Sequence, residues 1–160
     1  MSRAVLQLTA LFLLTACSGQ PQGGPGASQS GSGVTGLISS LSAAGANARQ
    51  AGTFDASPMQ GPGVLLCLAT EEVRVYVFPT EEARLTAARS IDQNDPSHVG
   101  TSIVEWTGNP RFWQRDSVLV LYLGTDPGTE ALLTRVMGQP FARGTGGGLG
   151  GPRSRACASS

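Results

Sequence analysis

The stretch PGVLLCLATEEVRVYVFPT, residues 62–80, carries the clearest structural signal of this 160-residue chain. Two runs rich in valine and leucine, at 64–69 and 73–78, flank the polar triplet Thr-Glu-Glu, and such a pair of runs predicts a β-hairpin. In the second run, valine alternates with arginine, tyrosine and phenylalanine. This period of two is typical of a strand in a sheet with one covered face.

Helix signals lie on both sides of the hairpin. After it, Pro79 ends the strand and Thr80 can cap a helix that runs to about residue 91, with two glutamates in its positive first turn. Before it, residues 35–44 place their apolar side chains on one helical stripe. A third helix is predicted from the pair Asp126-Pro127, a cap followed by proline, to Gly138.

Two further strands are expected at 101–106 and 118–124, joined by the connection TGNPRFWQRD, and residues up to 59 are only weakly extended. The order is then two hairpins, each followed by a helix. This order predicts an α+β fold, a two-layer sandwich in which an antiparallel sheet of two hairpins carries its helices on one face.

The chain starts with a short cationic segment, an apolar run at 4–14 and two small residues before a cysteine. The run is well short of the ~20 residues that cross a bilayer, so it is typical of an export signal. The motif Leu14-Thr15-Ala16-Cys17 resembles the lipobox of bacterial lipoproteins. The resemblance implies a signal peptide at 1–16, cleavage between Ala16 and Cys17, and a lipid on the Cys17 thiol. The alternative is an ordinary secretory peptide with a chance cysteine.

Four further stretches resemble small exported or lipid-anchored bacterial proteins without an assigned activity. They are VYVFPTEEAR, GTSIVEW, NPRFWQRDSVLVLYLG and LLTRVMGQPF, within residues 63–141. This resemblance supports the fold prediction and implies no particular chemistry.

Composition predicts how the chain is divided. Residues 17–36 are uncharged and rich in glycine, proline and serine, so they are predicted to form a flexible tether behind the lipidated cysteine. One α+β domain is expected at 37–143, and a disordered, glycine-rich basic tail at 144–160. We expect an extracytoplasmic, membrane-anchored protein. In a diderm host the resemblance favours the outer membrane, because Ser18 stands where aspartate commonly signals inner-membrane retention.

The charge distribution disfavours nucleic acid as a partner. All eleven acidic residues lie between Asp55 and Glu130, where five arginines leave a net charge of −6. Nucleic-acid-binding proteins present a basic face instead.

Two cysteines remain beside Cys17. Cys67 and Cys157 could pair as a disulfide in an oxidising compartment. The alternative is that Cys67 is an inert buried thiol and Cys157 is unpaired in the tail. No cysteine or histidine spacing is typical of a metal site, and no cofactor motif is present, so neither a metal nor a cofactor is expected.

The only histidine, His98, lies in the polar loop DQNDPSHVG. A Ser-His-Asp hydrolase would need these groups brought together beside an oxyanion hole, and no elbow motif such as G-x-S-x-G occurs. A calcium loop is excluded, because the required glycine and the glutamate at position twelve are missing. A solvated turn is the simpler interpretation.

Aromatic and arginine side chains are concentrated in EWTGNPRFWQR. Such side chains commonly anchor protein interfaces, and the candidate binding patch comprises Trp106, Arg111, Phe112, Trp113 and Arg115. The alternative is that the rings pair across a hairpin and cover the edge of the core.

These features together predict a membrane-tethered, non-enzymatic interaction module of the cell envelope. Its expected partners are the membrane, through the lipid, and an envelope protein. The alternative function is a small envelope hydrolase or ligand carrier that uses the loop around His98.

Overall fold

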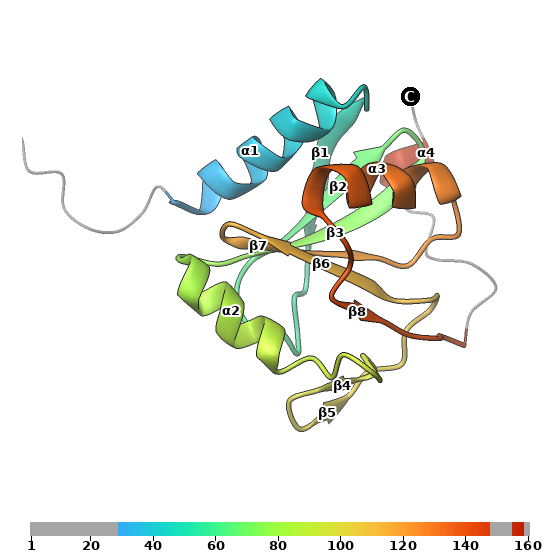
Figure 1. Ribbon diagram of the computed structural model, residues 1–160. Helices are drawn as coiled ribbons and strands as arrows, with labels where there is room; N and C mark the ends of the chain where they lie inside the picture. Colours follow the sequence, from blue (N-terminus) through green and yellow to red (C-terminus); the bar gives the residue numbers. More distant parts are fainter. Residues whose placement is uncertain (1–28, 148–154, 159–160) are drawn as a thin grey trace, which may run out of the picture.

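The computed structural model describes residues 29–147 and 155–158, and helices lie on both sides of its central sheet (Figure 1). Six strands form this antiparallel sheet in the order β1-β2-β3-β7-β6-β8, and β4 and β5 form a separate ribbon. The α+β class is therefore confirmed. In chain order the elements are α1 (Gln29–Ala43), β1 (Ala48–Phe54), β2 (Gly63–Leu68), β3 (Glu71–Val77), α2 (Glu81–Arg89), β4 (His98–Val99), β5 (Ser102–Ile103), β6 (Arg111–Arg115), β7 (Val118–Tyr122), α3 (Pro127–Met137), β8 (Ala142–Arg143) and α4 (Arg155–Ala158).

The hairpin predicted within 62–80 is confirmed. β2 and β3 pair antiparallel, from Gly63 opposite Tyr76 to Leu68 opposite Glu71. β3 also pairs with β7, so the hairpin supplies two inner strands of the sheet.

The strand predicted at 101–106 is wrong. Only β5 is extended there, and it pairs with β4 in the ribbon. β7 pairs instead with β6, which lies in the segment expected to be a connection. The alternation Arg-Phe-Trp-Gln-Arg places each aromatic ring on a different face of the sheet, and both faces are covered. Burial of two large rings therefore favours this segment as the strand.

The sheet has a core on each face, so the expectation of helices on one face only is wrong. α1 and α3 pack over the face that presents Val73, Val75 and Val77, and α2 belongs to the core of the opposite face. All five residues of β7 are buried, which requires cover on both faces. The central residues of the first core are Val34, Leu37, Leu41, Leu66, Trp113, Val120 and Leu133; those of the second are Met59, Phe78, Ile91, Val99, Trp106, Phe112, Leu119 and Leu121.

The predicted caps of α2 and α3 are confirmed. The Thr80 hydroxyl accepts a hydrogen bond from Ala83 N–H at 3.1 Å, and the Asp126 carboxylate accepts one from Thr129 N–H at 2.6 Å. Gly138 ends α3 with a φ of 88°, a conformation that disfavours other residues.

The predicted tether is too long at its C-terminal end. α1 begins at Gln29, and Val34 is buried in the first core. Helical spacing of Val34, Leu37 and Leu41 explains the extension, because one stripe reaches the sheet from all three positions.

The expectation of a disordered tail is wrong at both of its described parts. The N–H of Gly144 donates to Pro110 O at 3.0 Å, and that of Gly146 donates to Asn109 Oδ1 at 3.1 Å. Farther along, α4 buries Cys157 against the sheet. Backbone hydrogen bonds thus hold Gly144 and Gly146, and a buried sulfur holds α4, although both described parts have few apolar side chains.

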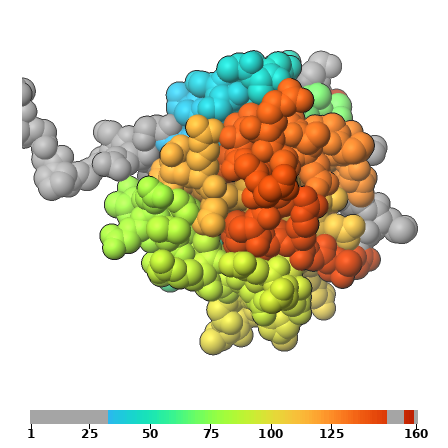
Figure 2. Space-filling view, viewed as in Figure 1, coloured from blue at the N-terminus to red at the C-terminus, as the bar shows by residue number. Residues whose placement is uncertain are grey.

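The predicted signal peptide, its cleavage site and Cys17 lie outside the described residues. Among the helices of 29–147 and 155–158, none is long and apolar enough to cross a membrane. In the space-filling view, α1 lies along one edge of the molecule and the β4–β5 ribbon projects at the opposite end (Figure 2).

Candidate functional site

The predicted aromatic patch is not a surface, and this prediction is corrected. Trp106 is 8 % exposed, and Phe112 and Trp113 are fully buried. Trp106 and Phe112 pack edge to face in the second core, with centroids 5.7 Å apart, whereas Trp113 lies in the first core. The sheet therefore separates rings that are close in sequence.

The two arginines of that patch bind elements of the same chain. Arg111 forms an ion pair with Glu130 at 2.9 Å and donates to Gly124 O at 2.8 Å. Arg115 donates to Val136 O at 2.7 Å, near the end of α3. Their contacts fix α3 to β6.

The loop around His98 does not form a catalytic relay. Asp95 contacts His98 Nδ1 at 2.9 Å, and Ser97 Oγ lies 3.4 Å from that same nitrogen. A Ser-His-Asp relay needs serine and aspartate on opposite ring nitrogens. The His98 and Asp95 side chains are 52 % and 56 % exposed. Hydrogen bonds from Ser97 lower the pKa of Asp95 and keep it an anion, as expected for a solvated turn.

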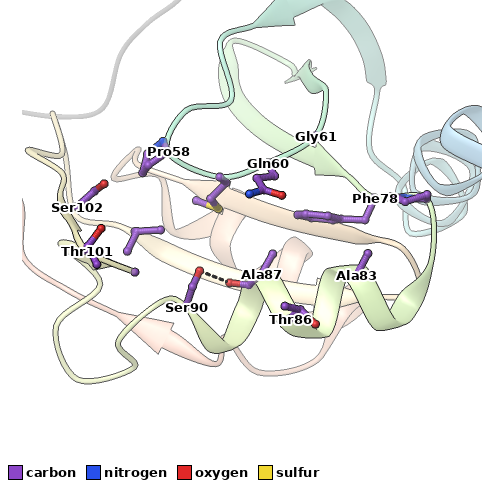
Figure 3. Close-up of a pocket in the computed structure, with 14 residues that line it drawn as sticks. Pro58, Gln60, Gly61, Phe78, Ala83, Thr86, Ala87, Ser90, Thr101 and Ser102 are labelled. Atoms are coloured by element: carbon purple, nitrogen blue, oxygen red, sulfur yellow. Dashed lines mark hydrogen bonds between the residues drawn. The ribbon is translucent and has the colours of Figure 1, made fainter.

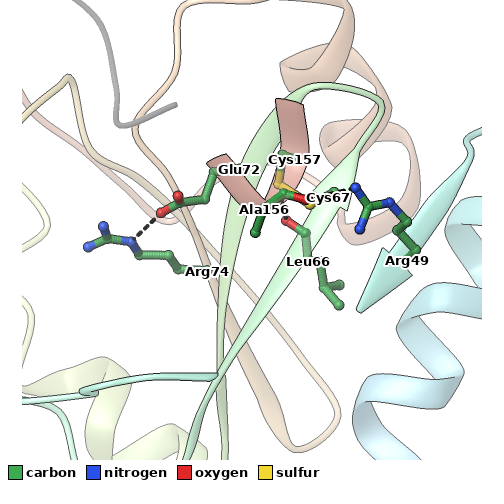
Figure 4. The surroundings of a disulfide bond; sticks show 7 residues. All are labelled: Arg49, Leu66, Cys67, Glu72, Arg74, Ala156 and Cys157. Atoms are coloured by element: carbon green, nitrogen blue, oxygen red, sulfur yellow. Dashed lines mark hydrogen bonds and ion pairs between the residues drawn. A yellow bond between two sulfur atoms is a disulfide. The ribbon is translucent and has the colours of Figure 1, made fainter. Parts of the chain in front are cut away.

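The two remaining cysteines are joined. The structure contains a disulfide between Cys67 in β2 and Cys157 in α4, with Cα atoms 5.3 Å apart (Figure 4). Both side chains are fully buried, and Arg49 Nη2 donates to Ala156 O at 2.8 Å beside the bond.

A groove of about 650 Å³ lies between α2, the segment 58–61 and the β4–β5 ribbon. Figure 3 shows Pro58 and Gln60 across from α2, with Thr101 and Ser102 at the end near Ser90. Met59, Phe78 and Val99 form an apolar floor, each at most 5 % exposed.

Hydroxyl and amide groups form the rim of the groove. Thr86 Oγ1 donates to Glu82 O at 3.0 Å and Ser90 Oγ donates to Ala87 O at 2.7 Å, so each hydroxyl keeps its lone pairs for a ligand donor. None of the 14 lining residues carries an ionisable side chain. The groove is therefore suited to an uncharged ligand with apolar and hydrogen-bonding parts.

Local sequence explains why the groove is open. Ala83 and Ala87 face it from α2, and their methyl groups leave space that larger side chains would fill. On the facing segment, Gly61 has a φ of 107°, and a Cβ there would lie 2.5 Å from Val77 O. Glycine is thus required for the segment to pass close to β3.

Arg84 fixes the α2 wall. It is 5 % exposed and donates to Gln114 Oε1 at 2.6 Å and to Asp116 O at 3.0 Å, on β6 and its turn. Glu81 pairs with the same guanidinium at 2.9 Å. The helix is held to the sheet by a charged side chain beneath it, which leaves the alanines free to line the groove.

No three histidine, cysteine, aspartate or glutamate side chains come together as a cation site in the described part of the chain.

Comparisons of the chain with protein-family models, curated proteins and solved structures find no match.

The groove was not predicted from sequence. The alanines that line it from α2 carry no sequence signal for an opening, and the facing segment 58–61 lies where no helix or hairpin was predicted. Its walls come from three segments that are separate in sequence and that pack together in the second core.

Proposed function

We propose that this protein is an extracytoplasmic lipoprotein, anchored through Cys17, that acts as a non-enzymatic binding module. The groove beside α2 is the binding site, and its ligand is uncharged and partly apolar. The observation that carries the proposal is the groove itself, an apolar floor with a hydroxyl rim and no ionisable lining side chain.

The Cys67–Cys157 disulfide supports export. Disulfides persist in oxidising compartments and are rare in the cytosol. This support is independent of the lipobox resemblance, because it depends on neither Cys17 nor the signal peptide.

The arrangement at His98 supports a binding role over hydrolysis. Serine and aspartate share one ring nitrogen, and the pair is solvated. The groove beside this loop offers hydroxyl and amide groups, but none of its lining residues can act as a general base.

Anchoring is tested by fractionating cells that express Cys17→Ser. We expect the variant to stay unprocessed or to leave the membrane fraction, because two or more acyl chains are needed for stable attachment. A processed variant that sediments with membranes as fully as the parent would overturn the lipid anchor.

The groove is tested with Nile red, an uncharged apolar dye, on the Cys17→Ser chain in detergent-free buffer. Ala87→Trp fills the groove, and Ala131→Trp adds the same side chain at an exposed site of α3 as the matched control. We expect dye fluorescence with the parent and the control, and at least a tenfold weaker affinity with Ala87→Trp. Equal affinities in all three proteins would overturn this site.

A further inference from the structure

The described end of the chain covers one end of the sheet. α4 contacts β1 and β2 and lies over Cys67, on the face opposite α1. Its other residues, Arg155, Ala156 and Ala158, are exposed. Figure 4 shows this single turn across the strands, with Arg49 on one side and the Glu72–Arg74 pair on the other.

Cys67 and Cys157 belong to neither hydrophobic core. The first core holds Leu66 and Leu68 from the same strand, and the second holds side chains from β3, β6 and β7. Lifting α4 therefore removes no residue from either core. The bond joins the body of the domain to a helix of four residues, Arg155–Ala158.

We propose that α4 is a redox-controlled strap: reduction of Cys67–Cys157 releases α4 while the domain stays folded, and uncovers Cys67 as a reactive thiol. Arg49 then loses the Ala156 carbonyl as an acceptor. The uncovered site takes thiol and disulfide compounds as reaction partners.

The chemistry is thiol–disulfide exchange with a dithiol as the reductant. One dithiol sulfur, as thiolate, attacks a sulfur of the protein disulfide, forms a mixed disulfide and expels the other cysteine as a thiolate. The second dithiol sulfur then attacks the mixed disulfide and releases the remaining cysteine. The dithiol is oxidised to a cyclic disulfide, and the protein gains two electrons and two protons as two thiols.

The test is native-state reduction of the whole chain with dithiothreitol, followed by pulses of iodoacetamide and peptide mapping, which separates Cys67 and Cys157 from Cys17. Tryptophan fluorescence is recorded in parallel, because Trp106 and Trp113 are both buried in the cores. We expect both cysteines to be alkylated while the fluorescence stays at its native value.

Two variants test whether the rate of reduction depends on how firmly α4 is held to β1. Arg49→Ala removes the hydrogen bond to Ala156, and we expect reduction to be at least about fivefold faster, because one net hydrogen bond alone corresponds to about that factor. Arg135→Ala, at an exposed position of α3, is the matched control and should reduce at the parental rate.

Two results would overturn the strap. One is alkylation that begins only at dithiothreitol concentrations where the tryptophan fluorescence is lost, since the bond would then open only with global unfolding. The other is a Cys157→Ser variant with native fluorescence in which Cys67 stays unalkylated, because something other than α4 would then cover it. Neither result depends on the Nile red groove.

Discussion

Arg84 and Trp113 are two buried polar side chains that differ in how fully their hydrogen bonds are satisfied. Arg84 meets three oxygens at hydrogen-bond distance, whereas the indole N–H of Trp113 has no partner among the described residues. A buried charge such as that of Arg84 is tolerated only while its hydrogen-bond partners are present, because removing a partner leaves the charge uncompensated. An unsatisfied donor is a cost that the packing of its ring must exceed.

Arg84→Ala should lower the free energy of unfolding by about 2–3 kcal/mol, because it strips the Gln114 amide and the Asp116 carbonyl of a charged donor. Urea denaturation measures this loss. Arg89→Ala, on the exposed side of the same helix, is the control and should stay within ~0.5 kcal/mol of the parent. Equal losses of stability in the two variants would contradict the conclusion that Arg84 holds α2 to the sheet.

Trp113→Ala should cost about 3–5 kcal/mol, since it empties a fully buried site. Trp113→Phe should cost clearly less, because it keeps most of the ring and removes the unpartnered N–H. Thermal melts of the two variants give the comparison. An unchanged melting temperature in Trp113→Ala would instead support an exposed aromatic patch, because a buried tryptophan cannot be removed without a loss of stability.

Local signals explain which elements could be predicted from sequence. Thr80 and Asp126 cap their helices through contacts within three residues, so their prediction needed no tertiary information. β6 was missed because Arg111 and Arg115 gave the segment the polarity of a loop. Their carbonyl and carboxylate partners lie on and around α3, well away in sequence.

The N-terminus of α3 gives the domain an acid-sensitive element. The N–H of Thr129 donates to Asp126 and lowers the pKa of that carboxyl below its usual 3.8. A depressed pKa in the folded state means that the cap stabilises α3 at pH values above about 4 and is lost as the pH falls through the folded-state pKa. The N-terminal end of the helix dipole adds to the preference for the anion.

Asp126→Asn keeps a cap acceptor but cannot titrate. We therefore expect the variant to lose less stability than the parent between pH 5 and pH 2.5, measured as the urea midpoint at about these two values. Asp95 titrates with the same sign in both proteins, so its contribution cancels in the comparison. Parallel pH profiles would show that the cap is not the source of the acid sensitivity.

The disulfide acts on the molecule as a whole, because it closes a sequence separation of 90 residues across β3 to β8. Chain-entropy arguments give about 4–5 kcal/mol for a loop of this length. The sequence left the pairing of Cys67 with Cys157 open and gave no indication of the groove. The glycine-rich tail carries no apolar pattern that would place Cys157 beside β2. Only the tertiary positions of β1 and β2 supply the contact.

Cys157→Ser should lower the free energy of unfolding by up to about 4–5 kcal/mol under oxidising conditions. In excess reductant, parent and variant should unfold at closely similar denaturant concentrations, because the parent then also lacks the bond. A gap between them that persists after reduction would place the stabilising effect in side-chain packing and not in the cross-link.

The proposal of an exported lipoprotein closed by one disulfide is tested by the intact mass of the protein extracted from its native membranes. We expect a chain that begins at Cys17, carries the added mass of its acyl groups, and lacks two hydrogens for the Cys67–Cys157 bond. A chain that still begins at Met1, without lipid and with all three cysteines as free thiols, would contradict it.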